Sequence, residues 1–119
     1  MTGLTSLSIT DQKLTSVDTS TMVNLTTLDL HNNLLTSFSS TGLTKLTTLN
    51  LSYNALPSFD GTDLTVLTSL NVSYNPAIPT LTFSNGKLNS FAGCGGMTAL
   101  TSVDLSGNKL TSFLGVYFS

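Results

Sequence analysis

The chain has 119 residues, enough for one domain with a hydrophobic core but not for two. Only 8% of its residues are charged and the net charge is −2, so it lacks the clustered lysine and arginine side chains that nucleic-acid binding requires. It contains no apolar run of the roughly 18 residues that span a bilayer, and its single cysteine excludes an internal disulfide and a cysteine-based metal site.

Apolar residues recur at a fixed spacing from the beginning of the chain. Units start at Leu4, Leu25, Leu46 and Leu67, each 21 residues after the one before. A last unit starts at Leu100, 33 residues after the fourth. The matching positions are Leu4, Leu7, Ile9, Gln12, Leu14 and Val17 in the first unit; Leu25, Leu28, Leu30, Asn33, Leu35 and Phe38 in the second; Leu46, Leu49, Leu51, Asn54, Leu56 and Phe59 in the third; Leu67, Leu70, Val72 and Asn75 in the fourth; and Leu100, Val103, Leu105, Asn108, Leu110 and Phe113 in the last.

Each unit predicts one coil of a solenoid. The alternation in Leu28-Asp29-Leu30 predicts a short strand with one buried face. Stacked in parallel, one strand per coil, these units share a core that no single unit could bury alone. Pro57 and the many serine and threonine residues predict a return path that is extended or 3₁₀-like, with little α-helix.

One polar position of the repeat is expected to be structural. It holds Asn33, Asn54, Asn75 and Asn108, with Gln12 in the first unit, and follows the strand where the chain turns away. A side-chain amide has two donors and a carbonyl acceptor, so it can satisfy backbone groups at the turn in its own coil and in the next one.

The L-x-x-L-x-L-x-x-N-x-L pattern resembles the leucine-rich repeat family, in the short form of about 21 residues typical of bacterial and protist surface proteins. Five copies cover nearly the whole chain, which makes the match specific. The resemblance implies a right-handed leucine-rich-repeat solenoid of five coils, one domain over residues 1–119, with one parallel strand per coil. Members of this family are mostly interaction scaffolds, so the resemblance alone does not fix the function.

The fourth coil, residues 67–99, is longer than the others. Its surplus of 12 residues falls mostly in Pro76–Lys87, and we expect a loop or hairpin excursion over residues 76–87. The alternative is a further strand that begins near Thr80, although Ile78 follows Leu67 by only 11 residues, too few for a full coil. This alternative rests on a second match to the template, made by Ile78, Leu81, Phe83, Gly86, Leu88 and Phe91.

The sequence points to no enzyme. His31 is the only histidine, and a dyad with Asp29 would face the open strand surface without a pocket. Cys94 lies among glycines, with nothing nearby in the sequence to activate a thiol. We therefore expect no catalytic residue, no cofactor and no metal site.

Two tyrosines one coil apart, Tyr53 and Tyr74, are the best candidate ligand contacts, because exposed aromatic side chains can stack on a sugar or anchor a protein. The alternative is that the two rings only stack on each other. The candidate contacts on the concave face are Tyr53, Tyr74, Asn50, Asn71 and His31. Three asparagines also match the N-glycosylation sequon: Asn24, Asn50 and Asn71.

The ends of the chain suggest stacking. If the first residue of a second chain followed the last residue of the first, the leucine intervals would read 21, 21, 21, 33 and 23, which indicates a whole number of coils. Head-to-tail contacts that do not close form filaments. The candidate stacking residues are Leu4, Leu7, Ile9, Leu14 and Val17 at one end and Leu105, Leu110, Phe113, Val116 and Phe118 at the other.

We therefore expect a non-enzymatic structural module that stacks end to end with itself or with further leucine-rich coils, as a filament or a longer array. An extracellular or cell-surface location is expected, although no signal peptide is visible in this chain. The alternative is an adhesin-like or receptor-like domain that recognises a protein or carbohydrate through its concave face. Nucleic acid and a membrane span are not expected.

Overall fold

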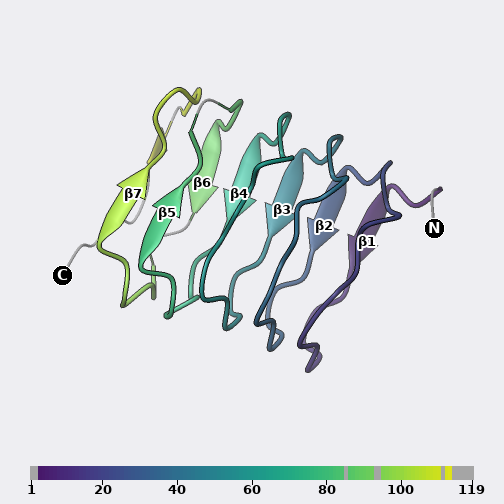
Figure 1. Cartoon of the computed structure of the whole chain (residues 1–119), viewed down its shortest axis with the longest axis horizontal. Coiled ribbons are helices and arrows are strands. Elements are labelled where there is room, and N and C mark those ends of the chain that lie inside the picture. Colours follow the sequence, from purple (N-terminus) through teal and green to yellow (C-terminus); the bar gives the residue numbers. More distant parts are fainter. Residues whose placement is uncertain (1–2, 85, 93–94, 111, 114–119) are drawn as a thin grey trace.

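The computed structural model describes residues 3–84, 86–92, 95–110 and 112–113, and only the backbone of the last two. The chain winds into a solenoid, with short strands along one face and the return segments along the other (Figure 1). No helix occurs among the described residues. The strands are β1 (Ser6–Ser8), β2 (Thr27–Asp29), β3 (Thr48–Asn50), β4 (Ser69–Asn71), β5 (Thr80–Thr82), β6 (Ser90–Ala92), β7 (Ser102–Asp104) and β8 (Ser112–Phe113).

Six of the strands form one parallel sheet, called sheet A here, in the order β1-β2-β3-β4-β6-β8. Leu28, Leu49 and Leu70 pair in register from β2 to β4. Each of these side chains is at most 1% exposed, because it points between the sheet and the return segments. Burial of one leucine contributes about 1.5–3 kcal/mol, so neighbouring coils hold each other in place. The parallel solenoid of about five coils that the repeat predicts is confirmed.

The repeat asparagines form a ladder of hydrogen bonds between coils. Nδ2 of Asn54 donates to the carbonyl oxygen of Leu51 in its own coil and of Leu30 in the preceding coil, each at 3.0 Å. Its Oδ1 accepts the N–H of Leu35 at 3.1 Å, again from the preceding coil. The amide therefore bridges to the coil before it, whereas the sequence suggested the coil after it. Asn33, Asn75 and Asn108 make the same set of bonds.

After β4 the chain departs from the expected path. Residues 80–82 form β5, which pairs in parallel with β7 and not with any strand of sheet A. This two-stranded sheet, sheet B, lies on the face along which the earlier coils return (Figure 1). Leu81 at its centre is fully buried. The loop excursion expected over residues 76–87 is therefore wrong, and the alternative with a strand at Thr80 is correct.

The interval of 33 residues between Leu67 and Leu100 is one and a half coils. The additional half turn, which contains β5, is called the half coil here. Each template unit has two apolar halves, L-x-x-L-x-L and L-x-x-F, and either half can supply a strand. In β6 the second half occupies sheet A, where Phe91 pairs with Leu70. The first half now lies on sheet B, where Leu81 pairs with Val103. The chain therefore does not hold a whole number of coils, because its last unit faces the opposite way from its first four.

Candidate functional site

A row of polar side chains closes the turns that follow β2, β3 and β4 of sheet A. Oδ1 of Asn50 accepts the backbone N–H of Ser52 at 3.0 Å and the hydroxyl of Ser52 at 2.7 Å. Asn71 holds Ser73 in the same way, at 3.1 and 2.7 Å. These are local side-chain-to-backbone turns, which asparagine, aspartate and serine favour.

Aspartate does the same work in two other units. Oδ1 of Asp104 accepts the backbone N–H of Ser106 at 3.0 Å, and the hydrogen bonds from Ser106 lower the pKa of this carboxyl below its usual value. Turn geometry thus explains why two of the three sequon triplets, those at Asn50 and Asn71, occur where they do. Oδ1 of Asn24 at the third accepts the Lys45 ammonium at 2.8 Å. Glycosylation of the three asparagines stays a prediction.

His31 belongs to the same row. Oδ1 of Asp29 accepts the backbone N–H of His31 at 3.1 Å and lies 2.6 Å from Nδ1 of its ring. The imidazole therefore takes the place that a serine hydroxyl has in the next two coils. About a third of each side chain is exposed. This pair is explained as a turn, and Cys94 lies outside the described residues.

Tyr53 and Tyr74 form a stacked pair beside this row. Their ring centroids are 4.3 Å apart and their planes differ by 6°. Both residues have positive φ, 56° and 58°, a conformation that is rare for bulky side chains and that Asp11 and Asn32 share at the same position. Desolvation first, and then the neighbouring Tyr74 hydroxyl, raise the pKa of Tyr53.

The other face of the Tyr74 ring packs on glycine backbone. A β-carbon on Gly95 would lie 3.7 Å from Cε2 of Tyr74, and one on Gly96 would collide with the ring. The tyrosines therefore stack on each other and on the next coil, as the alternative interpretation held. They still leave 51% and 44% of their surface exposed, so their edges remain open to a partner.

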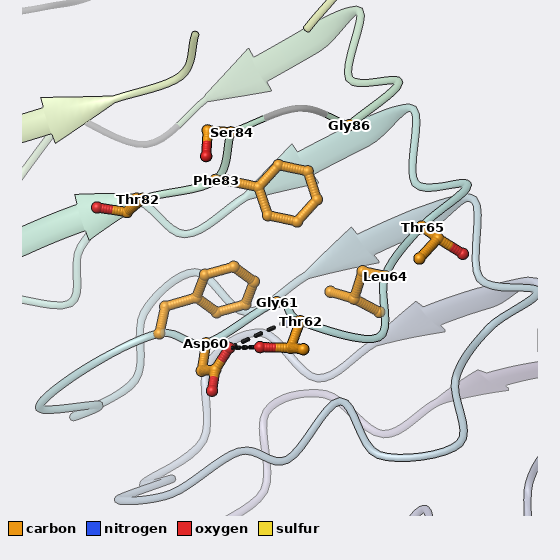
Figure 2. Close-up of a pocket in the computed structure, with 10 residues that line it drawn as sticks. Asp60, Gly61, Thr62, Leu64, Thr65, Thr82, Phe83, Ser84 and Gly86 are labelled. Atoms are coloured by element: carbon orange, nitrogen blue, oxygen red, sulfur yellow. Dashed lines mark hydrogen bonds between the residues drawn. The ribbon is translucent and has the colours of Figure 1, made fainter. Parts of the chain in front are cut away.

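A hollow of 370 Å³ lies where the half coil begins (Figure 2). Phe59 and Phe83 border it, with ring centroids 6.3 Å apart. Oδ1 of Asp60 accepts the N–H of Thr62 at 3.0 Å and also its hydroxyl, so the carboxylate is already engaged. Sequence reasoning missed this hollow, and its only signal was the pair Gly61 and Gly86, which flank Phe83.

Within the described residues, no three histidine, cysteine, aspartate or glutamate side chains form a group that could hold a metal ion. Buried side-chain nitrogen and oxygen atoms of the described residues all have hydrogen-bond partners. In the same part of the chain no helix is long and apolar enough to cross a membrane.

The first coil is only half covered. Its core side chains are partly exposed, whereas Leu25, Leu28 and Leu30 in the next coil are fully buried. The partly exposed residues are Leu4, Leu7, Ile9, Leu14 and Val17. At the other end Val103, Leu105 and Leu110 are also partly exposed. The side chain of Phe113, and Val116 and Phe118 altogether, lie outside what is described.

Two family models, each described as leucine rich repeat, match residues 2–56 and residues 99–119. The stretch between the two matches contains the half coil. No curated protein matches the chain. The repeat spacing, the parallel strands and the asparagine ladder agree with the two matches. This protein belongs to the leucine-rich repeat family.

Proposed function

We propose that this protein is a non-enzymatic interaction module that joins further leucine-rich coils end to end, as a filament or a longer array outside the cell. One observation carries the proposal: the first coil leaves core side chains partly exposed, whereas their counterparts Leu25, Leu28, Leu30 and Leu35 in the second coil are buried. A strand edge beside such side chains is a template for another strand.

The energy available is of the right size. Covering about 800 Å² in total, half to all of it apolar, would contribute roughly 10–20 kcal/mol. Lost translational and rotational freedom costs about 4–15 kcal/mol of this. Only 8% of the residues are charged, so little repulsion opposes the contact. Association is therefore expected to be reversible and concentration-dependent.

The test blocks one end at a time. The Ile9→Lys chain keeps only its C-terminal edge, and the Leu105→Lys chain keeps only its N-terminal edge. Sedimentation velocity should show assemblies for the unmodified chain, monomers for each variant alone, and dimers when the two variants are mixed. Monomers of the unmodified chain at every concentration would contradict the proposal.

A second variant separates blocked association from misfolding. In a parallel ladder alternate residues bond to opposite neighbours. In β2 the N–H of Thr27 donates to Thr5 O of the preceding coil at 3.2 Å. Ser6 and Ser8 of β1 pair with Thr27 and Asp29, so their N–H groups point the same way, toward the free edge. Ser8→Pro removes one such donor and leaves the core intact, since proline is tolerated on edge strands. It should block the N-terminal edge as Ile9→Lys does, with an unchanged circular dichroism spectrum.

Ligand binding through the stacked tyrosines is the second candidate. The favouring observation is that Tyr53 and Tyr74 are about half exposed although they pack on each other. Glycan-array binding should then occur with the unmodified chain and disappear with Tyr53→Asn. An array without signal, together with end-to-end assembly, would leave stacking as the function.

A further inference from the structure

The half coil gives the C-terminal edge of the protein two different strands. β8 ends sheet A and β7 ends sheet B, and no described strand lies beyond either of them. A second copy could place its β1 on either strand. The two arrangements differ by half a turn about the solenoid axis.

The asparagine ladder distinguishes the two edges. Each repeat asparagine bonds to a preceding coil whose first template half lies on the same face, as Asn108 does with Phe83 O at 2.5 Å and Leu88 N–H at 3.1 Å. The first coil has Gln12 in this position, and its amide reaches only Thr10 O of its own coil, at 3.3 Å. Gln12 therefore has unused donor and acceptor capacity at the free edge.

The β7 edge offers the matching groups. Leu105 O already accepts Asn108 Nδ2 at 2.9 Å, as Leu30 O accepts Asn33 Nδ2, and Leu30 O then accepts a second bond from the next coil. The N–H of Leu110 corresponds to the Leu35 N–H that Asn54 accepts, and no described residue accepts it. These are the two groups that a following amide needs.

We propose that the partner of the first coil is the β7 edge of a second copy, with Gln12 stacked after Asn108, so that successive copies are related by half a turn. This inference rests on the proposed end-to-end association. It names which of the two edge strands is used, and in which register.

The register brings two like charges together. Lys13 follows Gln12 as Lys109 follows Asn108, so the two lysines occupy matching positions in adjacent coils of the assembly, whose backbones lie about 4.8 Å apart along the stack. Placement of β1 on β8 would separate them onto opposite faces. The effect of these two charges on association therefore reports the register.

The experiment is a charge-swap cycle across one interface. Chains blocked by Ile9→Lys carry Lys109 or Lys109→Glu, chains blocked by Leu105→Lys carry Lys13 or Lys13→Glu, and all four mixtures are titrated at low salt. The two mixtures with opposite charges should bind about two- to fivefold more tightly than the two with like charges. Lys45→Glu, in a middle coil, makes the same change in net charge and should have no such effect.

Dimers with equal affinity in all four mixtures would overturn this register and leave end-to-end association standing. No dimer in any mixture would overturn both. If Leu105→Lys does not fold, the same four charge combinations are compared in unblocked chains by sedimentation velocity. There each single swap should enlarge the assemblies and the double swap should not.

Discussion

Gly61 makes room for the ring of Phe83, because a β-carbon on residue 61 would lie 2.5 Å from Cε1 of that ring. Gly61 belongs to the last regular coil and Phe83 follows the first strand of sheet B. Their contact therefore lies at the transition from the coils with one strand, on sheet A, to the coils with strands on both sheets. A side chain at residue 61 would push the ring out of its place over the core.

Gly61→Ala should consequently destabilise the protein by about 1–3 kcal/mol, the usual cost of overpacking a core. Urea unfolding followed by circular dichroism measures it. Gly3→Ala is the control, since nothing lies within 4 Å of a β-carbon there, and it should change stability by less than about 0.5 kcal/mol. Equal unfolding curves for the two variants would show that Phe83 does not depend on Gly61.

Asn54→Ala should cost about 1–3 kcal/mol, because it leaves the buried N–H of Leu35 without its acceptor. It also removes one of the two amide hydrogen bonds that Leu30 O and Leu51 O each accept. Gln12→Ala is the matched change at an exposed position of the same template. Thermal melts in the Ile9→Lys background, where association is blocked, should show a loss for Asn54→Ala only.

The tyrosine pair should be energetically coupled. In a double-mutant cycle with Tyr53→Asn and Tyr74→Asn, the coupling should be about 0.5–1.5 kcal/mol, typical of stacked aromatic side chains. Asparagine is the suitable replacement because Asn32 holds the same positive φ one coil earlier. Additive effects of the two changes would mean that the stack contributes no stability.

Acid should weaken the turn at Asp104. Its pKa is lowered in the folded protein, so its contribution to stability is present above the ordinary aspartate pKa and is lost as the pH falls through the lower folded value, below about pH 4. Asp104→Asn keeps the acceptor and removes the titration, so melting temperatures between pH 6 and pH 3 should fall less steeply. Asn50→Asp should have the opposite effect. A steeper fall for Asp104→Asn would refute this cause.

Deletion of residues 77–87 should turn the half coil back into a regular one. It joins Asn75-Pro76 to Leu88, which restores the N-x-L-x-x-F spacing, and shortens the interval from Leu67 to Leu100 from 33 to 22 residues. The last unit should then move to sheet A and place Asp104 beside Asn71.

Cysteines introduced at Asn71 and Asp104, in a Cys94→Ser background, report this move. They should form a disulfide in the deletion variant and not in the full chain, where Asp104 pairs with Thr82 on sheet B. Deletion of residues 77–82, which removes β5 without restoring the spacing, should unfold the C-terminal coils. A disulfide in the full chain would contradict the half coil.

The regular part of the fold could be predicted because its causes are local and repeated. In the second unit Leu28 and Leu30 alternate with polar residues and Asn33 follows at the turn, and the third and fourth units repeat this pattern. The half coil could not be predicted in the same way, since Leu88-x-x-Phe91 fits either half of the template. Which half of the template supplies the next strand of sheet A depends on tertiary packing against β4, which the repeat pattern does not specify.

The stacking of Tyr53 on Tyr74 was open for a similar reason. The sequence places the two residues one coil apart, but whether the rings point at each other depends on the φ of the turn. Gly96, which lets the next coil close on Tyr74, carried no readable signal in the sequence. The hollow beside Phe83 is lined by residues 59–62, 64 and 65 of a regular coil and by residues 82–84 and 86 of the half coil, so neither segment alone indicated it.

The half coil also places the polar residues at the strand ends on two opposite sides of the solenoid. The ladder Asp29, Asn50, Asn71 on sheet A is followed in register by Ala92, which ends the polar series. The same side-chain turn occurs again at Asp104, which lies on sheet B, on the opposite side of the solenoid. An assignment of surface positions from the repeat alone would therefore place Asp104 on sheet A, although it lies on sheet B. A partner that binds along this series would contact three consecutive positions on sheet A, and it could reach Asp104 only from the opposite side of the solenoid.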